Sequence, residues 1–435
     1  MEHNELKRRI ILLIFCLIFF IKPSYSQNPN EVINSLISSD NLFELKEQHS
    51  KLKGDIIPLL DYLSESILAS GFNRPKDGIN ALTTLLNDKT CREQLGFQNI
   101  INLTIMQAML YEQVCDYNSA SAVLKSLLKN TSDDKLGQSK AMLKNLLENE
   151  LRLASQAPQR LARPSVDSEL TYHLEATGRG QTMFVPAKIN GKKLKMIFDT
   201  GCPTYNFISE RIAKELGVTK VVDSIAIKGV GEGTAWIGSA DSLCVSDITY
   251  YNPLFYVVKE TATDSLYKDA AVLGANLFNA LGEVVFYPQE KKIVFPVKYT
   301  PLPASGQNLV MKNRQPYVKL NQDEKSILMH FDTGNVRTYM TQHYYLNNIE
   351  TIKRDGQKDS LRLGGYGGIT HEASYKLPLV RFELSGQEFV INDLDVSTVK
   401  AIDAWHEDGC FGTDFLQQLS KLTLSYKEMF IEIKN

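Results

Sequence analysis

One short pattern occurs twice in this chain, and it limits the possible folds more than any other feature of the sequence. Residues 196–201 read Met-Ile-Phe-Asp-Thr-Gly and residues 329–334 read Met-His-Phe-Asp-Thr-Gly, so Asp199 and Asp332 lie 133 positions apart (332 − 199). In both copies a mostly apolar run ends at an aspartate, and a glycine follows two positions later. This order is typical of a buried strand that ends in a tight turn. The repeat therefore indicates a duplicated β structure.

Other patterns repeat at nearly the same distance. Gly-rich stretches at residues 229–233 and 364–368 are offset by 135 positions (364 − 229). Three further pairs of stretches keep an offset of 138 positions: 272–277 with 410–415, 284–286 with 422–424, and 293–295 with 431–433. Short β-branched and aromatic runs alternate with Gly, Asn and Asp turns throughout this region. The sequence predicts two pseudo-symmetric β lobes, residues 169–303 and 304–435.

These motifs resemble those of the bilobal aspartic proteases of the pepsin and retropepsin clan, and the chain looks like an exported, bacterial-type member. The resemblance covers roughly residues 169–435. In that clan each lobe contributes one aspartate, and the two share a proton and activate the water that attacks the scissile carbonyl. The resemblance therefore implies that Asp199 and Asp332 are the catalytic residues. Two carboxyl groups a few ångströms apart cannot both ionise cheaply, which agrees with an acid–base pair.

The residues beside each aspartate match the same family. The predicted support of the catalytic loops consists of Thr200, Gly201, Thr333 and Gly334. By the resemblance, the two threonine hydroxyls bond across to the opposite loop, and the two glycines permit the tight backbone turn. Cys202 and Asn335 come next, where the family mostly carries Ser, Ala or Thr. These departures affect the expected arrangement of the proton that the two aspartates share.

A second glycine motif follows in each lobe. Gly274 and Gly412 look like the family's strand that passes behind the catalytic loop, where the lack of a side chain allows close backbone approach. Asn276 and Asp414 fit the usual polar position of that motif. We expect a structural role for all four residues.

The two Gly-rich hairpins resemble flaps that cover a substrate, because glycine gives the mobility that a lid requires. The predicted flap and substrate-binding residues are Gly229, Gly231, Gly233, Gly365, Tyr366 and Gly367. Tyr366 is similar to the flap tyrosine of pepsin-like enzymes, and an exposed aromatic in a turn is an equal alternative. A dinucleotide-binding loop is disfavoured because the strand-like residues 234–237 follow where a helix should begin.

The first part of the chain has a different sequence pattern. Residues 27–155 show helical periodicity and no strand alternation, so the fold class is predicted as mainly β with an all-α domain in front. Residues 81–86 and 123–128 share a leucine spacing that resembles tetratricopeptide repeats, and a plain helical bundle is an equal alternative. Residues 156–168, with two prolines and no apolar period, are the predicted linker.

The N-terminus is typical of a signal peptide. Basic residues at 7–9 precede a short apolar run, and Ser24 and Ser26 provide the small residues of a cleavage site. Cleavage after Ser26 would make Gln27 the first residue of an exported protein, destined for the periplasm, the cell surface or the medium. No later segment reaches about 18 consecutive apolar residues, so no integral membrane segment is expected after cleavage.

Composition excludes several partners. The 48 Lys and Arg residues nearly balance the 50 Asp and Glu residues, and a net charge of −2 gives no positive field to hold a nucleic acid. The seven histidines are scattered, and no CxxC or HExxH motif occurs. We therefore predict neither a metal nor a cofactor, and we expect each histidine to be a strand or surface residue.

The sequence predicts an aspartic endopeptidase that acts on a peptide or protein substrate. The alternative is a non-catalytic module of the same fold that binds peptides or proteins. The helical residues 27–160 are either a removable inhibitory prosegment or a permanent domain with a protein partner, and the sequence leaves both open. A Ser-His-Asp enzyme is disfavoured because no GxSxG motif is present.

Overall fold

The computed structural model describes residues 28–259, 271–323, 325–399 and 407–435. The chain divides into two compact units, Met1–Pro158 and Gln159–Asn435. The predicted signal peptide, residues 1–26, lies outside the described residues. Among the helices of the described part, none combines the length and the apolar character that a membrane crossing needs.

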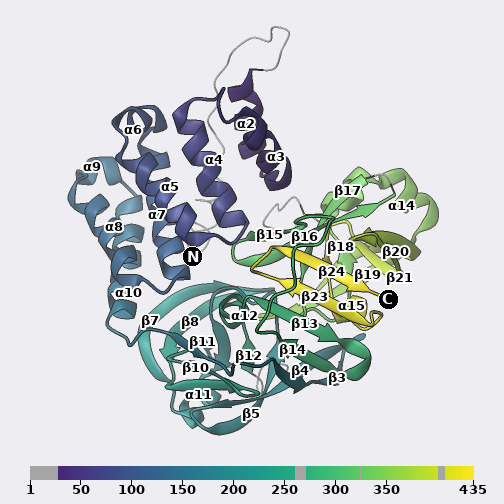
Figure 1. The fold of residues 1–435 in the computed structure, drawn as a ribbon. Coiled ribbons are helices and arrows are strands. Elements are labelled where there is room, and N and C mark those ends of the chain that lie inside the picture. Colours follow the sequence, from purple (N-terminus) through teal and green to yellow (C-terminus); the bar gives the residue numbers. More distant parts are fainter. Residues whose placement is uncertain (1–27, 260–270, 324, 400–406) are drawn as a thin grey trace. The chain divides into compact units, whose positions relative to one another are not determined.

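The first unit is helical, as the period of its leucines predicts. Its helices are α2 (Pro29–Ser38), α3 (Leu42–Leu52), α4 (Pro58–Gly71), α5 (Pro75–Asn87), α6 (Lys89–Leu95), α7 (Phe97–Gln113), α8 (Tyr117–Lys129), α9 (Asp133–Leu136) and α10 (Ser139–Ala154). Asp88 and Asp116 cap α6 and α8 by accepting hydrogen bonds from backbone N–H groups of the first turn. Consecutive long helices pack side by side (Figure 1), and Leu82, Leu124 and Leu143 lie in their core. The stretches that resemble tetratricopeptide repeats lie on α5 and α8, and the repeat itself stays a prediction.

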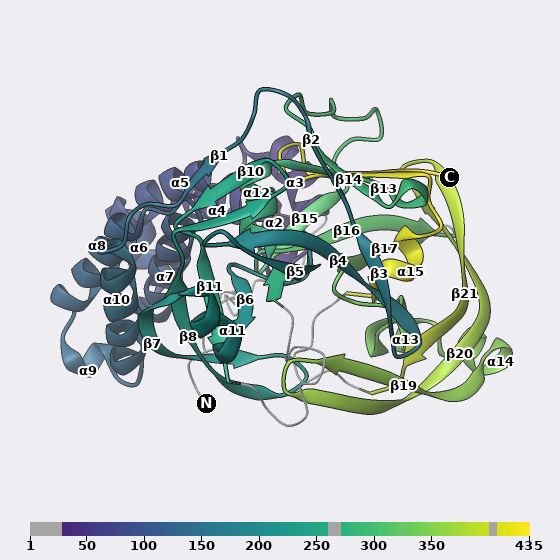
Figure 2. The same cartoon turned by 90° about the horizontal axis from the view of Figure 1, so that it is seen from below.

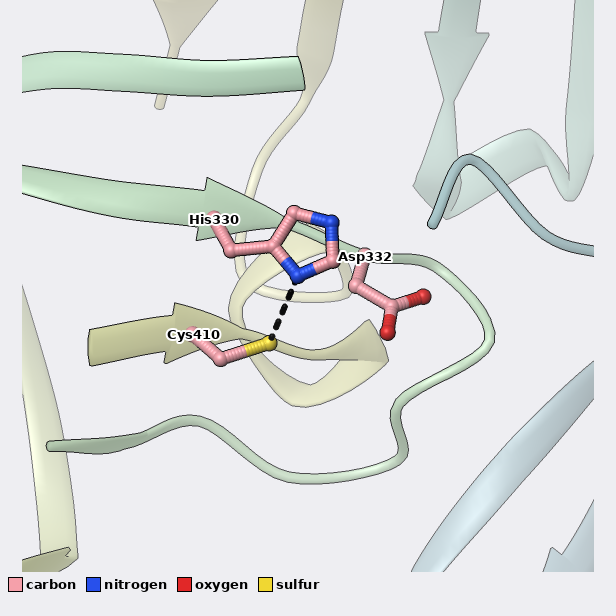
Figure 3. Close-up of side chains that lie close together, drawn as sticks. All are labelled: His330, Asp332 and Cys410. Atoms are coloured by element: carbon pink, nitrogen blue, oxygen red, sulfur yellow. Dashed lines mark hydrogen bonds between the residues drawn. The ribbon is translucent and has the colours of Figure 1, made fainter. Parts of the chain in front are cut away.

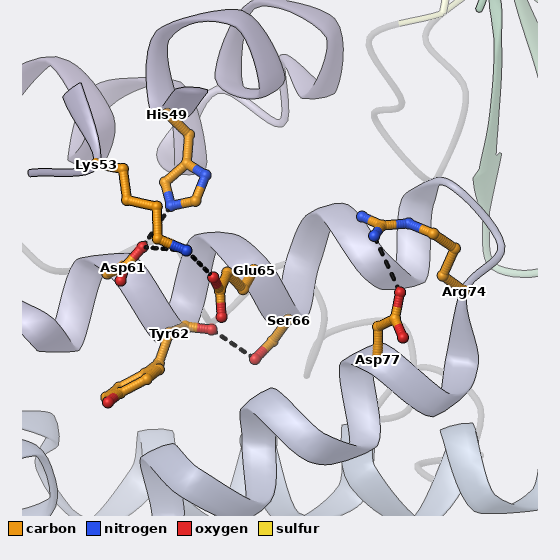
Figure 4. A network of polar contacts seen from close by, with 8 residues as sticks. All are labelled: His49, Lys53, Asp61, Tyr62, Glu65, Ser66, Arg74 and Asp77. Carbon is orange, nitrogen blue, oxygen red and sulfur yellow. Dashed lines mark hydrogen bonds and ion pairs between the residues drawn. The ribbon is translucent and has the colours of Figure 1, made fainter. Parts of the chain in front are cut away.

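A polar network joins α3 to α4 (Figure 4). Nε2 of His49 lies 2.7 Å from Oδ1 of Asp61, and Lys53 pairs with Glu65. His49 is buried, so this contact satisfies a ring nitrogen that would otherwise lack a partner. The network therefore stabilises the packing of the two helices against each other.

The second unit begins with a sheet in the order β1-β10-β9-β4-β5-β12-β6-β11-β8-β7, and β3 pairs with β4. The strands are β1 (Arg160–Ala162), β3 (His173–Thr177), β4 (Gly180–Ile189), β5 (Lys192–Phe198), β6 (Asn206–Ser209), β7 (Thr219–Lys228), β8 (Glu232–Ser239), β9 (Ser242–Val245), β10 (Ile248–Tyr251), β11 (Leu254–Val258) and β12 (Ala271–Leu273). Helices α11 (Glu210–Leu216) and α12 (Ala275–Leu281) belong to the same lobe. The predicted linker is partly wrong, because β1 lies inside it and pairs with the edge strand β10.

The second lobe is built around a sheet in the order β15-β16-β17-β22-β18-β21-β20-β19. Its strands are β15 (Leu309–Lys312), β16 (Gln315–Gln322), β17 (Lys325–Phe331), β18 (Tyr339–Met340), β19 (Gln357–Gly365), β20 (Gly368–Leu384), β21 (Gln387–Ser397) and β22 (Gly409–Phe411). Its helices are α13 (Gln342–Asn347), α14 (Ile349–Asp355) and α15 (Thr413–Leu416). Stacked rings of Phe411 and Phe415, 4.2 Å apart, fill part of its core.

A third sheet joins the lobes, in the order β2-β14-β13-β23-β24. It consists of β2 (Ser168–Thr171), β13 (Glu283–Tyr287), β14 (Lys292–Phe295), β23 (Lys421–Ser425) and β24 (Phe430–Lys434), with the 3₁₀ turn η1 (Pro288–Glu290) between β13 and β14. Val285 pairs with Thr423, its own counterpart at the offset of 138, so a local twofold axis passes between β13 and β23. The predicted boundary at 303/304 therefore does not separate the lobes completely.

The fold class is confirmed: the chain is mainly β, with two sheet-rich lobes and an N-terminal helical region. The consequence for the site is that each Asp-Thr-Gly motif follows a central strand of its own lobe. In Figure 2 the β7–β8 and β19–β20 hairpins of the second unit lie along the lower part of the picture.

Candidate active site

Each aspartate is held at the end of a central strand. Asp199 follows β5, which pairs in parallel with β12, and Asp332 follows β17, which pairs in parallel with β22. The N–H of Asp199 donates to the carbonyl of Leu273, and that of Asp332 to the carbonyl of Phe411. The strand that ends in the second glycine motif thus fixes the start of each loop.

A symmetric set of hydrogen bonds joins the two loops. The N–H of Thr200 donates to Oγ1 of Thr333 at 3.1 Å, and the N–H of Thr333 donates to Oγ1 of Thr200 at 3.0 Å. Each hydroxyl in turn donates to a strand carbonyl of the opposite lobe, that of Phe331 at 2.8 Å or that of Phe198 at 2.7 Å. Both threonines are buried. The structure thus contains the cross-lobe hydroxyl bonds that the resemblance implied.

These bonds bring the two carboxyl groups face to face. A Cβ atom on Gly201 would lie 2.4 Å from Cγ of Asp332, and one on Gly334 would lie 2.4 Å from Cγ of Asp199. Neither glycine has a positive φ. Both glycines lie in the turn that follows the aspartate, as predicted, and the closeness of the opposite aspartate is what excludes a side chain there.

The pair cannot carry two full charges cheaply. Burial and the neighbouring carboxylate of Asp332 raise the pKa of Asp199 well above its ordinary value. A backbone N–H binds one oxygen of each carboxylate, from Gly201 to Asp199 and from Gly334 to Asp332, both at 2.8 Å. The arrangement favours one proton held between two fixed carboxyl groups.

The two residues that depart from the family pattern both lie against this pair. Sγ of Cys202 lies 3.4 Å from the carbonyl of Tyr205, and burial raises the pKa of its thiol well above the usual range. The N–H of Asn335 donates to Oδ1 of Asp332 at 3.2 Å. Asn335 thus adds a second backbone donor to Asp332, and the backbone of Cys202 likewise forms a hydrogen bond with Asp199, while the thiol of Cys202 stays neutral.

The second glycine motif lies as predicted behind each loop. A Cβ atom on Gly274 would lie 2.6 Å from the carbonyl oxygen of Tyr205, and one on Gly412 would lie 2.6 Å from the backbone nitrogen of Arg337. Close approach of two backbones therefore excludes a side chain at both positions.

The polar residues of that motif are not equivalent. Oδ1 of Asp414 accepts hydrogen bonds from the N–H and the hydroxyl of Thr338, both at 2.8 Å. The side chain of Asn276 has no partner among the described residues. In the first lobe Asn206 stabilises the motif instead, because its Oδ1 accepts from the N–H of Gly274. Asp414 thus makes the hydrogen bonds of this position, and the structural role of Asn276 stays a prediction.

The tips of the two Gly-rich hairpins contact each other. The N–H of Gly231 donates to the carbonyl of Tyr366 at 2.9 Å, and a Cβ atom on Gly233 would lie 2.3 Å from the Tyr366 hydroxyl. The ring of Tyr366 packs edge-on against Phe207 at 5.5 Å, so Tyr366 is not an exposed turn aromatic.

The other flap glycines lie at the same contact. A Cβ atom on Gly229 would lie 2.7 Å from the Tyr366 carbonyl oxygen, and one on Gly365 would lie 3.0 Å from the Val230 side chain. Gly367 has a φ of 88°, which side chains rarely adopt. The glycines therefore allow two hairpin tips to meet, and their role in covering a substrate stays a prediction.

A cavity of about 350 Å³ lies beside the carboxyl pair. Its walls include Asp199 and Asp332, the hairpin residues Val230 and Gly365, and three arginines at positions 179, 337 and 362. The cavity is partly open to solvent, and its lining carries Asp395 as well as the basic groups. It can hold part of an extended chain against the carboxyl groups.

One cluster was missed from the sequence. His330, Asp332 and Cys410 lie together at the wall of this cavity (Figure 3), and their ligand-type atoms are all within 4.8 Å of one another. Burial lowers the pKa of His330 and raises that of the Cys410 thiol. The sequence did contain a signal for this cluster, because His330 stands two positions before Asp332 and Cys410 stands two positions before Gly412.

One family model matches part of the second unit. Residues 185–280 match the family model described as "gag-polyprotein putative aspartyl protease". The matched range contains the first aspartate loop, the first Gly-rich hairpin and Gly274. No curated protein matches the chain.

Similar solved structures share little sequence with this chain. The structure titled "Crystal structure of edgp" has a TM-score of 0.40 at 9% identity and covers 63% of this chain and 95% of that chain. A retropepsin-like aspartic protease from Rickettsia conorii has a TM-score of 0.21 at 14% identity, with 32% of this chain and 93% of that chain covered. Basic 7S globulin from soybean has a TM-score of 0.40 at 8% identity, with 62% and 95% covered. These similarities are too low to transfer an activity.

Proposed function

We propose that this protein is an aspartic endopeptidase that hydrolyses peptide bonds with a water activated between Asp199 and Asp332. The observation that carries the proposal is the pair of glycines that face the opposite carboxyl groups with no room for a Cβ atom. A plain structural loop has no need to bring two carboxyl groups so close, since their mutual repulsion costs stability. The match of residues 185–280 to an aspartyl protease family supports the same function.

The chemistry follows from one proton shared by two carboxyl groups. The water oxygen attacks the scissile carbonyl carbon while the ionised carboxyl group takes a proton from that water. The protonated carboxyl group gives its proton to the carbonyl oxygen. The resulting gem-diol returns a proton to the pair, the pair protonates the amide nitrogen, and the C–N bond breaks. A carboxylic acid and an amine leave, and the pair again holds one proton.

The cavity suggests a preference in the substrate. Arg337 donates to the carbonyl of Asp393, and its Nε has no partner within the described part of the chain. Arg362 also faces the cavity, and the carboxylate of Asp395 in the same wall lies 4.0 Å from Nζ of Lys376. Arg179 lies 3.8 Å from the carboxylate of Asp359, which leaves Arg337 and Arg362 as the basic groups that a substrate at this wall can meet. We propose that a substrate side chain placed here is acidic.

The decisive experiment compares the wild-type protein with Asp199→Asn and Asp332→Asn on a peptide library. Asn is nearly isosteric with Asp but cannot exchange the proton, so each variant should lose almost all cleavage and remain folded. The double variant should be little worse than either single one, because the pair acts as a unit. Wild-type protein that binds peptides tightly without cleaving them would favour the binding module instead.

We also propose that the protein is exported after cleavage behind Ser26 and that the helical unit either binds a protein partner or acts as a prosegment. The basic and apolar residues of the N-terminus support export. Recovery of the helical unit joined to the active protein, or its loss by proteolysis, would distinguish the partner-binding domain from the prosegment.

A further inference from the structure

The two lobes differ at one pair of facing positions beside the aspartates. In the first lobe Ile197 on β5 pairs with Val272 on β12, and both are buried against Phe184 in an apolar cluster. The same offsets of 133 and 138 positions lead to His330 and Cys410, which pair in the same register between β17 and β22. The second lobe therefore carries two metal-ligating side chains where the first lobe is apolar.

Packing alone does not require this replacement. Tyr317 takes the place of Phe184 and stacks on the His330 ring at 4.9 Å. Nε2 of His330 is buried and has no hydrogen-bond partner among the described residues. A buried polar atom without a partner costs stability, and the first lobe avoids that cost with isoleucine and valine. The histidine and the cysteine therefore need another explanation.

Their geometry is that of an incomplete metal site. Nδ1 of His330 lies 3.8 Å from Sγ of Cys410, and Figure 3 shows the ring nitrogen directed at the sulfur. Zinc bonds of about 2.0 Å to nitrogen and 2.3 Å to sulfur in a tetrahedral site place those two atoms about 3.5 Å apart. A carboxylate oxygen of Asp332 completes a set within 4.8 Å, so small side-chain movements suffice to close it.

The neighbours of the set hold it in place. Backbone N–H groups of Gly334 and Asn335 bind Oδ1 of Asp332 at 2.8 and 3.2 Å. Nδ2 of Asn335 lies 3.4 Å from Sγ of Cys410, a contact that stabilises a thiolate. Imidazole nitrogen, thiolate and carboxylate are the ligands that zinc takes in proteins, with a fourth position left to water.

We propose that His330, Cys410 and Asp332 bind a thiophilic divalent cation such as Zn²⁺, and that the bound ion inhibits the carboxyl pair. The metal site does not depend on the proposed protease function, whereas the inhibition rests on it. On binding, the Cys410 thiol releases its proton to solvent and the sulfur bonds the metal. A carboxylate bound to the ion can neither share the proton of Asp199 nor take one from water.

The site is tested without reference to activity by adding Co²⁺ to the purified full-length protein. A thiolate bound to Co²⁺ gives a charge-transfer band in the near ultraviolet, and Zn²⁺ should displace it. The variants are His330→Ile and Cys410→Val, which copy the residues of the first lobe. We expect Cys410→Val to abolish the band and His330→Ile to weaken Zn²⁺ binding by at least about tenfold.

Cys202→Ser is the matched control, since Cys202 also lies close to the pair but contacts the carbonyl of Tyr205. The control should keep the band and the Zn²⁺ affinity of the wild type. A band that survives Cys410→Val, or that Cys202→Ser removes, would overturn the site.

Inhibition is measured next, as the loss of peptide cleavage with rising Zn²⁺ and its return with a chelator. Cleavage by the double variant His330→Ile with Cys410→Val should require at least about tenfold more Zn²⁺ for the same loss. Equal inhibition of wild type and double variant would refute the second half of the proposal. An inactive wild type would count against the protease function, and the cobalt band would still decide whether the metal site exists.

Discussion

Replacing Thr200 by Val should separate the cross-lobe hydrogen bonds from every other feature of the site. Valine has nearly the shape of threonine, so the change removes the hydroxyl and leaves the packing. Two buried groups then lose a partner, the N–H of Thr333 and the carbonyl of Phe331. Each unsatisfied buried group costs about 1–3 kcal/mol, which gives about 2–6 kcal/mol for the variant. This is a large part of the stability of about 5–15 kcal/mol that is typical of a folded protein.

Trp236 lies on β8 in the unit Gln159–Asn435, so its fluorescence, measured in a Trp405→Phe background, follows the unfolding of this unit. A loss of 1 kcal/mol lowers Tm by about 2–4 °C in a unit of this size, so Thr200→Val should lower it by roughly 5–20 °C. Cleavage should fall by about 100-fold, because small displacements of reacting groups have effects of that order.

Thr200→Ser is the control, since it keeps the hydroxyl and removes only a methyl group. It should retain most of the wild-type activity and lower Tm far less than the valine variant. Equal Tm values for Thr200→Ser and Thr200→Val would refute the reasoning, because the hydroxyl would then contribute nothing.

Four further outcomes follow from the structure. Because its carboxyl group has a raised pKa in the folded state, Asp199 destabilises the protein as pH rises above the ordinary carboxyl pKa of 3.8; the Tm of Asp199→Asn should therefore exceed that of wild type at neutral pH and converge with it in acid. Gly334→Ala should abolish cleavage, since its Cβ would lie 2.4 Å from Cγ of Asp199, and an active alanine variant would contradict the observed contact. Arg362→Gln should reduce a preference for Glu over Gln peptides by about two- to fivefold, the effect of an exposed ion pair, and an unchanged preference would remove Arg362 from the substrate site. N-terminal sequencing of exported protein should find Gln27 first, whereas exported protein that starts at Met1 would refute the cleavage.

The positions of the catalytic loops could be predicted because a local signal determines them. A buried strand followed by a glycine turn can be read from a few residues, and two copies at matching offsets predict two lobes. The pairing of β13 with β23 has no such signal, since the two strands lie far apart in sequence and carry no motif that marks them as partners. Strand β1 was missed for a related reason: three residues after a proline carry no pattern of their own, and they form a strand because the edge of β10 is available.

What the sequence could not show in the site also depends on contacts between residues far apart in the chain. Asn276 occupies the expected place in the motif, yet Asn206 reaches the backbone of Gly274 from another strand and makes the stabilising bond. Sequence spacing gives the order of residues along one strand. It does not show which side chain of a neighbouring strand contacts that strand. The sequence also could not show what excludes a side chain at Gly201, because that atom, Cγ of Asp332, belongs to the opposite lobe.

Because the fold is duplicated, the first lobe can be compared with the second at the cluster of His330, Cys410 and Asp332, which the sequence did not predict. Positions that both lobes need for packing are apolar in both, as with Phe198 and Phe331 before the two aspartates. The positions of Ile197 and His330 are equivalent in register and in distance from the aspartate, so packing imposes the same demand on both. Isoleucine meets that demand in the first lobe. The histidine therefore reflects something that packing does not require, and its nearest polar neighbours are a cysteine sulfur and a catalytic carboxylate.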